Sequence, residues 1–342
     1  MPKRKEPQRI RIEDVAEFAG VSTATVSRVL NKTGIVSPET VERVLEAIAE
    51  LDYVPHAAAR GLASRKTNIL GVIFPEISGL FFSALLRGIE TCLTENGYGL
   101  LLYSTQGRIL ENNEPPPLNE SNSDGLIIFT DCLSEDHLRR LHARGFPMVI
   151  LHRTPPEGVN IPCITFENKQ GARQMTEHLL TVHGYQRIAY LAADGVEDSA
   201  WREMGYREAL GAHNLPFDPA LVGNAMFEDR VAEVVVNDWL MDGVEFQAIF
   251  AGDDESARGA IRALQRAGKR VPQDVAVVGF DDALLSQYLT PPLTTVRAPI
   301  EEAGRCAAAQ LIQLINTGQA EPLTLLPVEL VIRQSCGCRP IR

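Results

Sequence analysis

The sequence of 342 residues has few cysteines, and no long hydrophobic run is visible in it. Its six cysteines are scattered, which excludes a disulfide-rich scaffold and is typical of reduced thiols. No stretch reaches the roughly 18 apolar residues that a membrane-spanning helix needs. The N-terminus is basic, but no apolar run follows it, so it does not match a secretory signal. We therefore expect a cytoplasmic protein with no membrane partner.

Motifs for metal or phosphate chemistry are also scarce. Cys336 and Cys338 have the spacing of half a metal site, but no second pair of Cys or His residues stands near them in the sequence. The segment from Gly268 to Arg270 lacks the spacing and the Ser or Thr of a phosphate-binding P-loop. No paired nucleophile and base is visible, so we expect no metal, no cofactor and no enzyme activity. An enzyme on the same scaffold is the alternative, which a turnover assay with sugars and nucleotides would detect.

Positive charge is in the minority, because 33 Lys and Arg stand against 44 Asp and Glu, for a net charge of -11. Such a balance argues against nucleic-acid binding by the chain as a whole. The charges are unevenly spread, however. Residues 1–66 contain 11 Lys and Arg against 9 Asp and Glu, a net of +2, which leaves -13 for the rest of the chain. An acidic distal part does not prevent a separate N-terminal domain from meeting phosphates.

Two short amphipathic patterns joined at Gly20 occupy residues 10–31. Ser22 can cap the second pattern by accepting a hydrogen bond from a free amide of its first turn. Glycine permits the left-handed backbone that a tight turn between helices needs. The pattern predicts a helix-turn-helix, although by spacing alone any two packed helices would look alike. The apolar stripes are Ile12, Val15, Ala16 and Ala19 in the first helix and Val26, Val29 and Leu30 in the second.

A third helix and a linker follow this pair. Residues 37–39 read Ser-Pro-Glu, which places a capping hydroxyl, a proline and an acid at the start of a helix that runs to about Leu51. Residues 56–64 favour a helix but contain Gly61 and are too few to persist as a helix in water. We expect this linker to become ordered only on a surface such as DNA.

From Asn68 onward, short apolar runs alternate with helical patterns, which predicts an α/β fold with a doubly wound parallel sheet. Prolines interrupt the alternation near Thr294 and Leu325, which is compatible with two lobes between which the chain crosses more than once. Three prolines at 115–117 forbid a helix interior, so we expect a short helix or an ordered loop over residues 106–122. The apolar runs are ILGVIF, YGLLLYS, DGLIIF, PMVILH, RIAYLAA, AIFAG, VAVVGF and VELVIRQS.

Specific motifs occur in one order along nearly the whole chain. They are DVAEFAGVSTATVSRVLN, PHAAARGLAS, GVIFPEISGLFF, the set Ser199, Arg202 and Gly205, AGDDESARGAI, VPQDVAVVGFDD and PPLTTVRAP. In this combination the sequence resembles the LacI/GalR family of transcriptional regulators. The resemblance implies an N-terminal all-α helix-turn-helix headpiece, a hinge helix and a two-lobed effector domain like the periplasmic sugar-binding proteins. It also implies a repressor that binds a two-fold symmetric DNA operator as a homodimer or tetramer, under control of a small carbohydrate or related effector.

The resemblance predicts domain boundaries. We expect the headpiece over residues 1–55, the hinge over 56–67 and the effector-binding and dimerisation domain over 68–342. Within the last, the N-lobe is expected over about 68–165 and 297–326, and the C-lobe over about 166–296 and 327–342. A solute-binding protein without DNA affinity is the remaining alternative, which the headpiece opposes; an electrophoretic shift with genomic DNA fragments would decide it.

The same resemblance implies residues that contact DNA. Arg28 is the best candidate for base reading, since its fork can pair with guanine O6 and N7. Ala24 can only touch a thymine methyl, and Leu62 corresponds to a leucine that enters the minor groove. Arg11 stands where the family usually has Thr, so the first helix loses an N-cap worth roughly 1 kcal/mol, partly offset by two acids that follow. The predicted set is Thr23, Ala24, Thr25, Ser27, Arg28, Asn31, His56, Arg60 and Leu62.

Effector-binding residues are implied in the same way. Arg202 and Asp281 would donate and accept hydrogen bonds toward ligand hydroxyls. His152 stands where the family often has Asp, and Ala298 where a Gln is common. Such a histidine could bind a phosphate or carboxylate, make the response sensitive to pH, or merely be hydrogen-bonded at a strand end. The predicted set is Phe81, Phe82, His152, Phe166, Arg202, Asp253 and Asp281.

Overall fold

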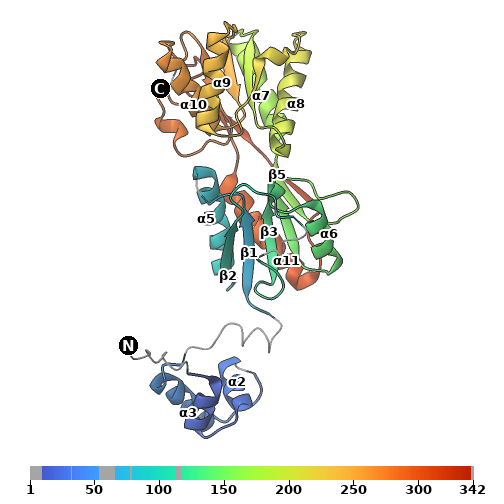
Figure 1. Ribbon diagram of the computed structural model, residues 1–342, viewed down its shortest axis with the longest axis vertical. Helices are drawn as coiled ribbons and strands as arrows, with labels where there is room; N and C mark the ends of the chain where they lie inside the picture. The colour runs from blue at the N-terminus through green and yellow to red at the C-terminus, as the bar shows by residue number, and fades with distance from the viewer. Residues whose placement is uncertain (1–9, 32, 54–65, 78, 112–116, 340–342) are drawn as a thin grey trace, which may run out of the picture. The chain divides into compact units, whose positions relative to one another are not determined.

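The computed structural model describes residues 10–31, 33–53, 66–77, 79–111 and 117–339. The chain divides into an N-terminal unit, residues 1–67, and a C-terminal unit, residues 68–342 (Figure 1). Among the described helices, none is both long enough and apolar enough to cross a membrane.

The described residues of the N-terminal unit form three helices, as the sequence predicts: α1 (Ile12–Ala19), α2 (Thr23–Asn31) and α3 (Pro38–Glu50). Gly20 ends α1 with a φ of 65°, in the left-handed region. Ser37 caps α3 by accepting from the Thr40 amide. The buried residues of the three helices form a single small core. They are Val15, Ala16, Ala19, Val26, Val44, Ala47 and, after α3, Tyr53.

The backbone at the start of α1 has a side-chain hydrogen bond, although the N-cap residue itself provides no side-chain acceptor. Arg11 has no side-chain oxygen to offer to the helix amides. The carboxylate of Asp14 instead accepts a hydrogen bond from the Arg11 amide at 2.7 Å, which is one half of a capping box. Asp14 therefore contributes a specific bond in addition to its favourable position at the positive end of the helix dipole.

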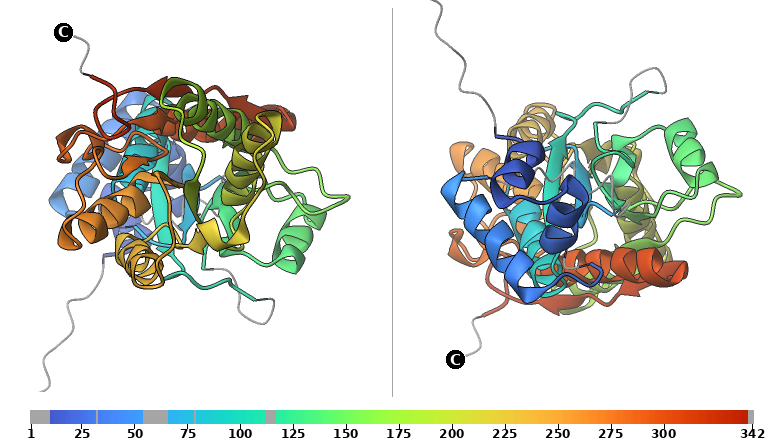
Figure 2. Two further views of the ribbon diagram at one scale, coloured as in Figure 1. Left: turned by 90° about the horizontal axis from the view of Figure 1, so that it is seen from above. Right: turned by 90° about the horizontal axis from the view of Figure 1, so that it is seen from below.

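Two parallel sheets, defining two lobes, organise the C-terminal unit. The first lobe has a six-stranded sheet in the order β11-β5-β4-β3-β1-β2, with every pairing parallel. Its strands are β1 (Ile69–Phe74), β2 (Gly99–Ser104), β3 (Gly125–Phe129), β4 (Met148–Leu151), β5 (Cys163–Phe166) and β11 (Leu323–Leu326). Its helices are α5 (Leu80–Glu95), α6 (Glu135–Ala143) and α11 (Ile300–Thr317), of which α6 is green and α11 is red in Figure 2.

The second lobe has a four-stranded parallel sheet in the order β7-β6-β8-β9. Alternate residues of its strands enter two separate apolar clusters, Tyr190 and Phe250 on one side and Leu191 and Ile249 on the other, so helices cover both faces. The strands are β6 (Ile188–Ala192), β7 (Val222–Asn224), β8 (Ala248–Ala251) and β9 (Ala276–Val278). The helices are α7 (Asn168–Val182), α8 (Glu197–Ala212), α9 (Asp229–Met241) and α10 (Asp254–Arg266).

The chain crosses between the lobes more than once, as the interrupted alternation predicts. It leaves the first lobe after β5, returns after β9 and leaves again after β11. Two crossing segments pair as antiparallel strands, β10 (Thr295–Arg297) and β12 (Glu329–Val331). Short 3-10 helices complete the described elements: η1 (Thr130–Cys132), η2 (Pro219–Leu221) and η3 (Ser286–Tyr288).

The proline-rich stretch around residues 106–122 is an ordered loop in its described parts, which contain no helix. Leu110 forms an isolated bridge with Leu133, and Leu118 is buried. Beyond it, Asn119 caps its own turn by accepting from the Ser121 amide at 2.9 Å. Two buried leucines thus anchor the described parts of this stretch.

Glycines set how closely the helices pack. A Cβ added at Gly304 in α11 would lie 2.1 Å from the Leu85 carbonyl oxygen of α5, and one at Gly88 in α5 would lie 1.9 Å from the Glu301 oxygen. The same close approach recurs between α7 and α8 at Gly205, and between α9 and α10 at Gly259. At these points only a residue without a side chain lets the backbones meet.

We predict that Gly304→Ala destabilises the C-terminal unit by at least about 1–3 kcal/mol, because the added methyl overlaps a backbone atom that cannot turn aside. Gly211→Ala is the matched control, since Gly211 also lies in a helix but has nothing within 4 Å of an added Cβ. That control should raise stability by up to about 1 kcal/mol through helix propensity. Urea unfolding followed by circular dichroism measures both, and equal midpoints for the two variants would contradict the packing argument.

Candidate functional site

Six of the nine residues predicted to contact DNA lie on α2, and three of them form an exposed face of this helix. Thr23, Ala24 and Arg28 are exposed, while Val26 is fully buried beneath them. The hydroxyl of Ser22 accepts from the Thr25 amide at 3.2 Å and lies 2.9 Å from the Thr25 hydroxyl. The predicted cap is therefore present, and the helix turns its small polar side to solvent. Helices that read the major groove present such a face.

The aliphatic part of the Arg28 side chain packs closely against Gly34. A Cβ placed on Gly34 would lie 3.5 Å from Cδ of Arg28, so the stem of the arginine passes closely over this glycine. Gly34 adopts a φ of 72°, which other residues rarely accept. Ser27 is half buried, and Asn31 lies at the end of α2. The hinge residues predicted to contact DNA, His56, Arg60 and Leu62, lie outside the described residues.

Aromatic rings gather at the carboxyl ends of the first-lobe strands. Phe129 ends β3, His152 directly follows β4 and Phe166 ends β5. The His152 ring centroid lies 5.1 Å from that of Phe129 and 4.8 Å from that of Phe166. Phe81, in the first turn of α5, completes the group at 5.6 Å from His152, and Phe82 packs on Phe129 at 5.2 Å. Ligands of open α/β sheets bind at this edge.

Asp198 of α8 connects His152 to the second lobe. Nδ1 of His152 lies 2.8 Å from Oδ2 of Asp198, and the Thr165 hydroxyl donates to Oδ1 at 2.8 Å. Burial alone would raise the Asp198 pKa, but His152, Arg202 and the Thr165 hydroxyl together lower it. The carboxylate is therefore ionised and can only accept, so Nδ1 of His152 carries the proton. Nε2 of His152 is buried and has no hydrogen-bond partner among the described residues.

Arg202, also on α8, is buried at 3% exposure and is held from several sides. Its Nε donates to Oδ1 of Asn168 at 2.8 Å, and its Nη1 donates to the Gly252 carbonyl oxygen at 2.6 Å. Nη2 lies 3.2 Å from Oδ1 of Asp281. The guanidinium also stacks 3.8 Å above the centroid of the Phe280 ring. The sequence-predicted pair of Arg202 and Asp281 is thus brought together.

Several acids crowd this arginine. Burial raises the pKa of Asp281 well above the usual carboxyl value; Arg202 opposes this, whereas Asp253, Asp254 and Asp198 reinforce it. Oδ1 of Asp281 is buried and has an ion-pair distance to Arg202 but no well-aligned hydrogen bond among the described residues. A buried acceptor in this state is suited to a ligand hydroxyl.

Asp253 lies at the same end of the second sheet but has a structural task. It is the N-cap of α10, where its carboxylate accepts from the Ser256 amide at 3.0 Å and the Glu255 amide at 3.2 Å. Asp254 accepts from the hydroxyls of Ser286 and Thr295, and burial raises its pKa to about 7. Asp254 thus has a structural role.

Several residues around this site have positive φ without being glycine, among them His152 at 60°, Phe227 at 59° and Asp281 at 107°. Non-glycine residues held in this region cost roughly 1–3 kcal/mol each, and such residues cluster at functional sites. Phe227 lies 5.6 Å from the Arg202 guanidinium. The strained residues thus surround the arginine and the aromatic group.

Sequence reasoning missed part of this constellation. Asp198, Asn168, Phe129 and Phe280 belong to it as firmly as the predicted residues. Phe129 and Phe280 each stand at or just after the carboxyl end of a strand, which is a signal that position alone provides. Asp198 and Asn168 lie on helices, where an acid or an amide gives no such signal.

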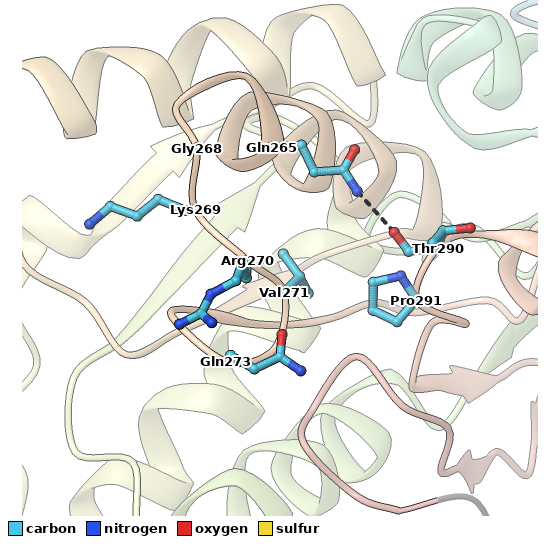
Figure 3. Close-up of a pocket in the computed structure, with 8 residues that line it drawn as sticks. All are labelled: Gln265, Gly268, Lys269, Arg270, Val271, Gln273, Thr290 and Pro291. Carbon is cyan, nitrogen blue, oxygen red and sulfur yellow. Dashed lines mark hydrogen bonds between the residues drawn. The ribbon is translucent and has the colours of Figure 1, made fainter.

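A surface hollow at the end of α10 is separate from these residues (Figure 3). The Gln265 side chain closes part of its wall by donating to the Thr290 carbonyl oxygen at 2.9 Å, and Arg270 is paired with Asp274. It contains none of the predicted site residues. The lining residues are Gln265, Gly268, Lys269, Arg270, Val271, Gln273, Thr290 and Pro291.

Comparison with known proteins gives consistent matches for both units. Residues 11–56 match the family of bacterial regulatory proteins, lacI family, and residues 176–336 match a periplasmic binding protein-like domain. The ribose operon repressor of Halalkalibacterium halodurans is 38% identical over 327 residues, which cover 95% of this chain and 96% of that protein. The HTH-type transcriptional regulator CelR of Thermobifida fusca is 34% identical over 98% of this chain and 100% of its own length.

Solved structures agree with these relatives. A lac repressor dimer bound to operator and the anti-inducer ONPF has a TM-score of 0.81 and 28% identity, and the match covers 96% of this chain and 99% of that one. A LacI family transcriptional regulator from Enterococcus faecium with bound ribose has a TM-score of 0.70 and 29% identity over 78% of this chain and 98% of that one. The fold class and the family predicted from the sequence are confirmed. The chain belongs to the LacI family of bacterial transcriptional regulators.

Proposed function

We propose that the chain is a repressor that binds a two-fold symmetric DNA operator as a homodimer, and that a sugar or sugar derivative bound in the C-terminal unit changes its affinity for that operator. The observation that carries the proposal is the meeting of His152, Asp198 and Arg202, which joins the two lobes beside a group of aromatic rings. The lac repressor dimer bound to operator and the Enterococcus faecium regulator with bound ribose support the same reading.

The polar groups of the candidate site suit a sugar. Nε2 of His152 accepts a hydrogen bond when the imidazole is neutral, and Oδ1 of Asp281 can accept another, so both complement ligand hydroxyls. Phe81 and Phe166 lie beside His152, and we infer that the C–H faces of a sugar pack against these rings. An aromatic surface with a few convergent polar groups is the usual composition of a small-molecule site.

Thermodynamic linkage would connect this site to the DNA. A ligand that binds one arrangement of the lobes more tightly than the other shifts the population toward that arrangement. The resulting change in operator affinity cannot exceed the ratio of the two ligand affinities, and couplings of this kind typically amount to about 5–150-fold. Because His152 belongs to the first lobe and Asp198 to the second, a ligand that competes for either group changes how the lobes are joined.

Arg28→Ala should relax sequence preference at one base pair in each operator half-site, since a bidentate arginine–guanine contact discriminates by about 1–3 kcal/mol. Arg28→Lys is the matched comparison. It keeps the positive charge but loses the planar fork, so it should lose the same preference while binding nonspecific DNA as well as the wild type. Selection of bound sequences by both variants measures the effect. If the base preferences match those of the wild type, Arg28 does not read the operator.

Arg202→Lys should weaken effector binding by about 10-fold to 100-fold, because a lysine lacks the planar fork whose separate nitrogens donate to Asn168 and to the Gly252 carbonyl oxygen. Calorimetric titration of the full chain with a panel of pentoses, hexoses and their phosphates measures this. Arg207→Lys is the control on the same helix, where an exposed arginine pairs with Glu203. Equal sugar affinities for the two variants would refute the assignment of Arg202, and the absence of binding by the wild type to every sugar would refute the effector class.

A further inference from the structure

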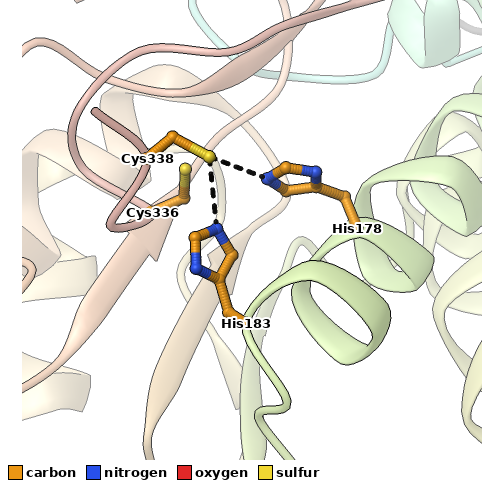
Figure 4. Close-up of side chains that lie close together, drawn as sticks. All are labelled: His178, His183, Cys336 and Cys338. Atoms are coloured by element: carbon orange, nitrogen blue, oxygen red, sulfur yellow. Dashed lines mark hydrogen bonds between the residues drawn. The ribbon is translucent and has the colours of Figure 1, made fainter. Parts of the chain in front are cut away.

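Four side chains with metal-binding atoms converge in the second lobe, away from the site described above. They are His178, His183, Cys336 and Cys338, and one ligand atom from each lies within 4.8 Å of the other three (Figure 4). Sγ of Cys338 is 3.4 Å from Nε2 of His183 and 3.7 Å from Nε2 of His178. Cys336 is buried, and the other three are partly exposed, so an ion from solvent can reach the cluster.

Two segments distant in the sequence hold these side chains. His178 lies in the last turns of α7 and His183 is its C-cap residue. The cysteines lie on the segment after β12, which is fixed to the rest of the lobe because Oγ of Ser335 accepts from the Thr294 amide at 2.8 Å. Figure 4 shows both cysteine sulfurs on the side of the segment that faces the two imidazoles.

Gly337 makes the approach of the two segments possible. Its φ of 105° lies in the region that favours glycine. A Cβ at this position would lie 3.4 Å from the His183 ring and 3.4 Å from the Tyr185 hydroxyl, so the turn between the cysteines passes directly against the histidine. The turn thus brings both thiols to one side of the same imidazole.

The neighbouring groups orient the cluster as outer partners orient metal ligands. The Tyr185 ring stacks on His183, with centroids 5.3 Å apart and an interplanar angle of 13°. Its hydroxyl donates to the carbonyl oxygen of Cys336 at 3.2 Å. The Thr294 hydroxyl is 3.2 Å from Sγ of Cys336. Cys336 is therefore held by hydrogen bonds and the His183 ring by stacking, and among the ligand atoms only Sγ of Cys336 takes part in these hydrogen bonds.

The distances fit a tetrahedral ion. With Zn–N of about 2.1 Å and Zn–S of about 2.3 Å, the ligand atoms of a tetrahedral zinc site lie about 3.4–3.8 Å from one another. Both distances from Sγ of Cys338 already have these values, and the remaining pairs, which lie within 4.8 Å, need to close by about 1.4 Å at most to reach them. Two thiolates with two imidazoles are a donor set that zinc prefers, whereas magnesium and calcium require oxygen ligands.

The protonation of the groups sets the chemistry of binding. Burial lowers the pKa of both His178 and His183, and a histidine binds a metal ion through its neutral imidazole. Burial and the adjacent Cys336 raise the pKa of the Cys338 thiol to about 11. A zinc ion would deprotonate the thiols, so its binding must release protons to the solvent.

We propose that His178, His183, Cys336 and Cys338 bind one Zn²⁺ ion per chain and that this ion ties the C-terminal segment to the end of α7. Four protein ligands leave no open position, which is the arrangement of a structural rather than a catalytic zinc site. The proposal replaces the expectation of no metal that the sequence suggests. The second pair of ligands stands 155 and 160 residues before Cys338 and becomes a neighbour only through the fold.

The test uses the full chain, purified with a thiol reductant and without metal, then loaded with Zn²⁺ or Co²⁺ and desalted. We expect one equivalent of zinc by atomic emission, a thiolate-to-cobalt charge-transfer band in the cobalt form, and a higher unfolding temperature with zinc. Cys338→Ser should lose the stoichiometric metal, the charge-transfer band and the zinc-dependent rise in unfolding temperature. His178→Ala, which leaves both thiols in place, should bind cobalt at least about 10-fold more weakly.

Cys306→Ser is the matched control, because Cys306 is also a partly exposed free cysteine but lies on α11, outside the cluster. It should keep the metal, the band and the thermal shift. Zinc well below one equivalent in the wild type, cobalt binding without a charge-transfer band, or loss of metal in Cys306→Ser would each overturn the proposal. A Cys336–Cys338 disulfide that persists under the reductant and excludes zinc would also overturn it. If Cys338→Ser fails to fold, His178→Ala decides.

Discussion

The buried contact between His152 and Asp198 is the interaction on which the C-terminal unit depends. It places a carboxylate where water is excluded, and a buried charge is costly unless hydrogen bonds and an opposite charge satisfy it. Thr165 provides a further bond to Asp198, and the positive charge of Arg202 stabilises it. Arg202 in turn requires Asn168 and the Gly252 carbonyl. A molecule that enters here must supply replacements for the bonds it breaks, which restricts the site to polar ligands of matching shape.

The sequence predicted those parts of the fold that follow from local periodicity. The three N-terminal helices, their Ser22 and Ser37 caps and the alternation of strands and helices all leave a pattern within a few turns of chain. The bond that Asp14 makes to the start of α1 was missed, because a capping box written with Arg11 at its first position has no standard signature. In the stretch around residues 106–122, the prolines argued against a long helix but did not predict which residues anchor the loop.

The candidate sites divide in the same way. Arg202 and Asp281 could be predicted through motifs that resemble a known family, and the structure places them in contact. Asp198 and Asn168 could not, since their partners lie in other elements and an isolated acid or amide on a helix has no distinguishing spacing. The cluster of His178, His183, Cys336 and Cys338 is the extreme case, because the two histidines stand 160 and 155 residues before Cys338 in the sequence. Residues so far apart in one chain are brought together by the topology of the fold, and topology is the property that local sequence patterns describe least.

The close backbone contacts that glycines allow between helices limit how the molecule can move. At Gly88 and Gly304 the backbones of α5 and α11 touch, and Gly205 and Gly259 lock the helix pairs of the second lobe in the same manner. Backbones this close cannot slide past one another without collision, so each lobe behaves as a stiff block. Any rearrangement must then occur in the three segments of the chain that connect the two lobes, as a hinge motion between rigid lobes. Allostery in this molecule would then change the angle between the two lobes and leave the packing within each lobe unchanged.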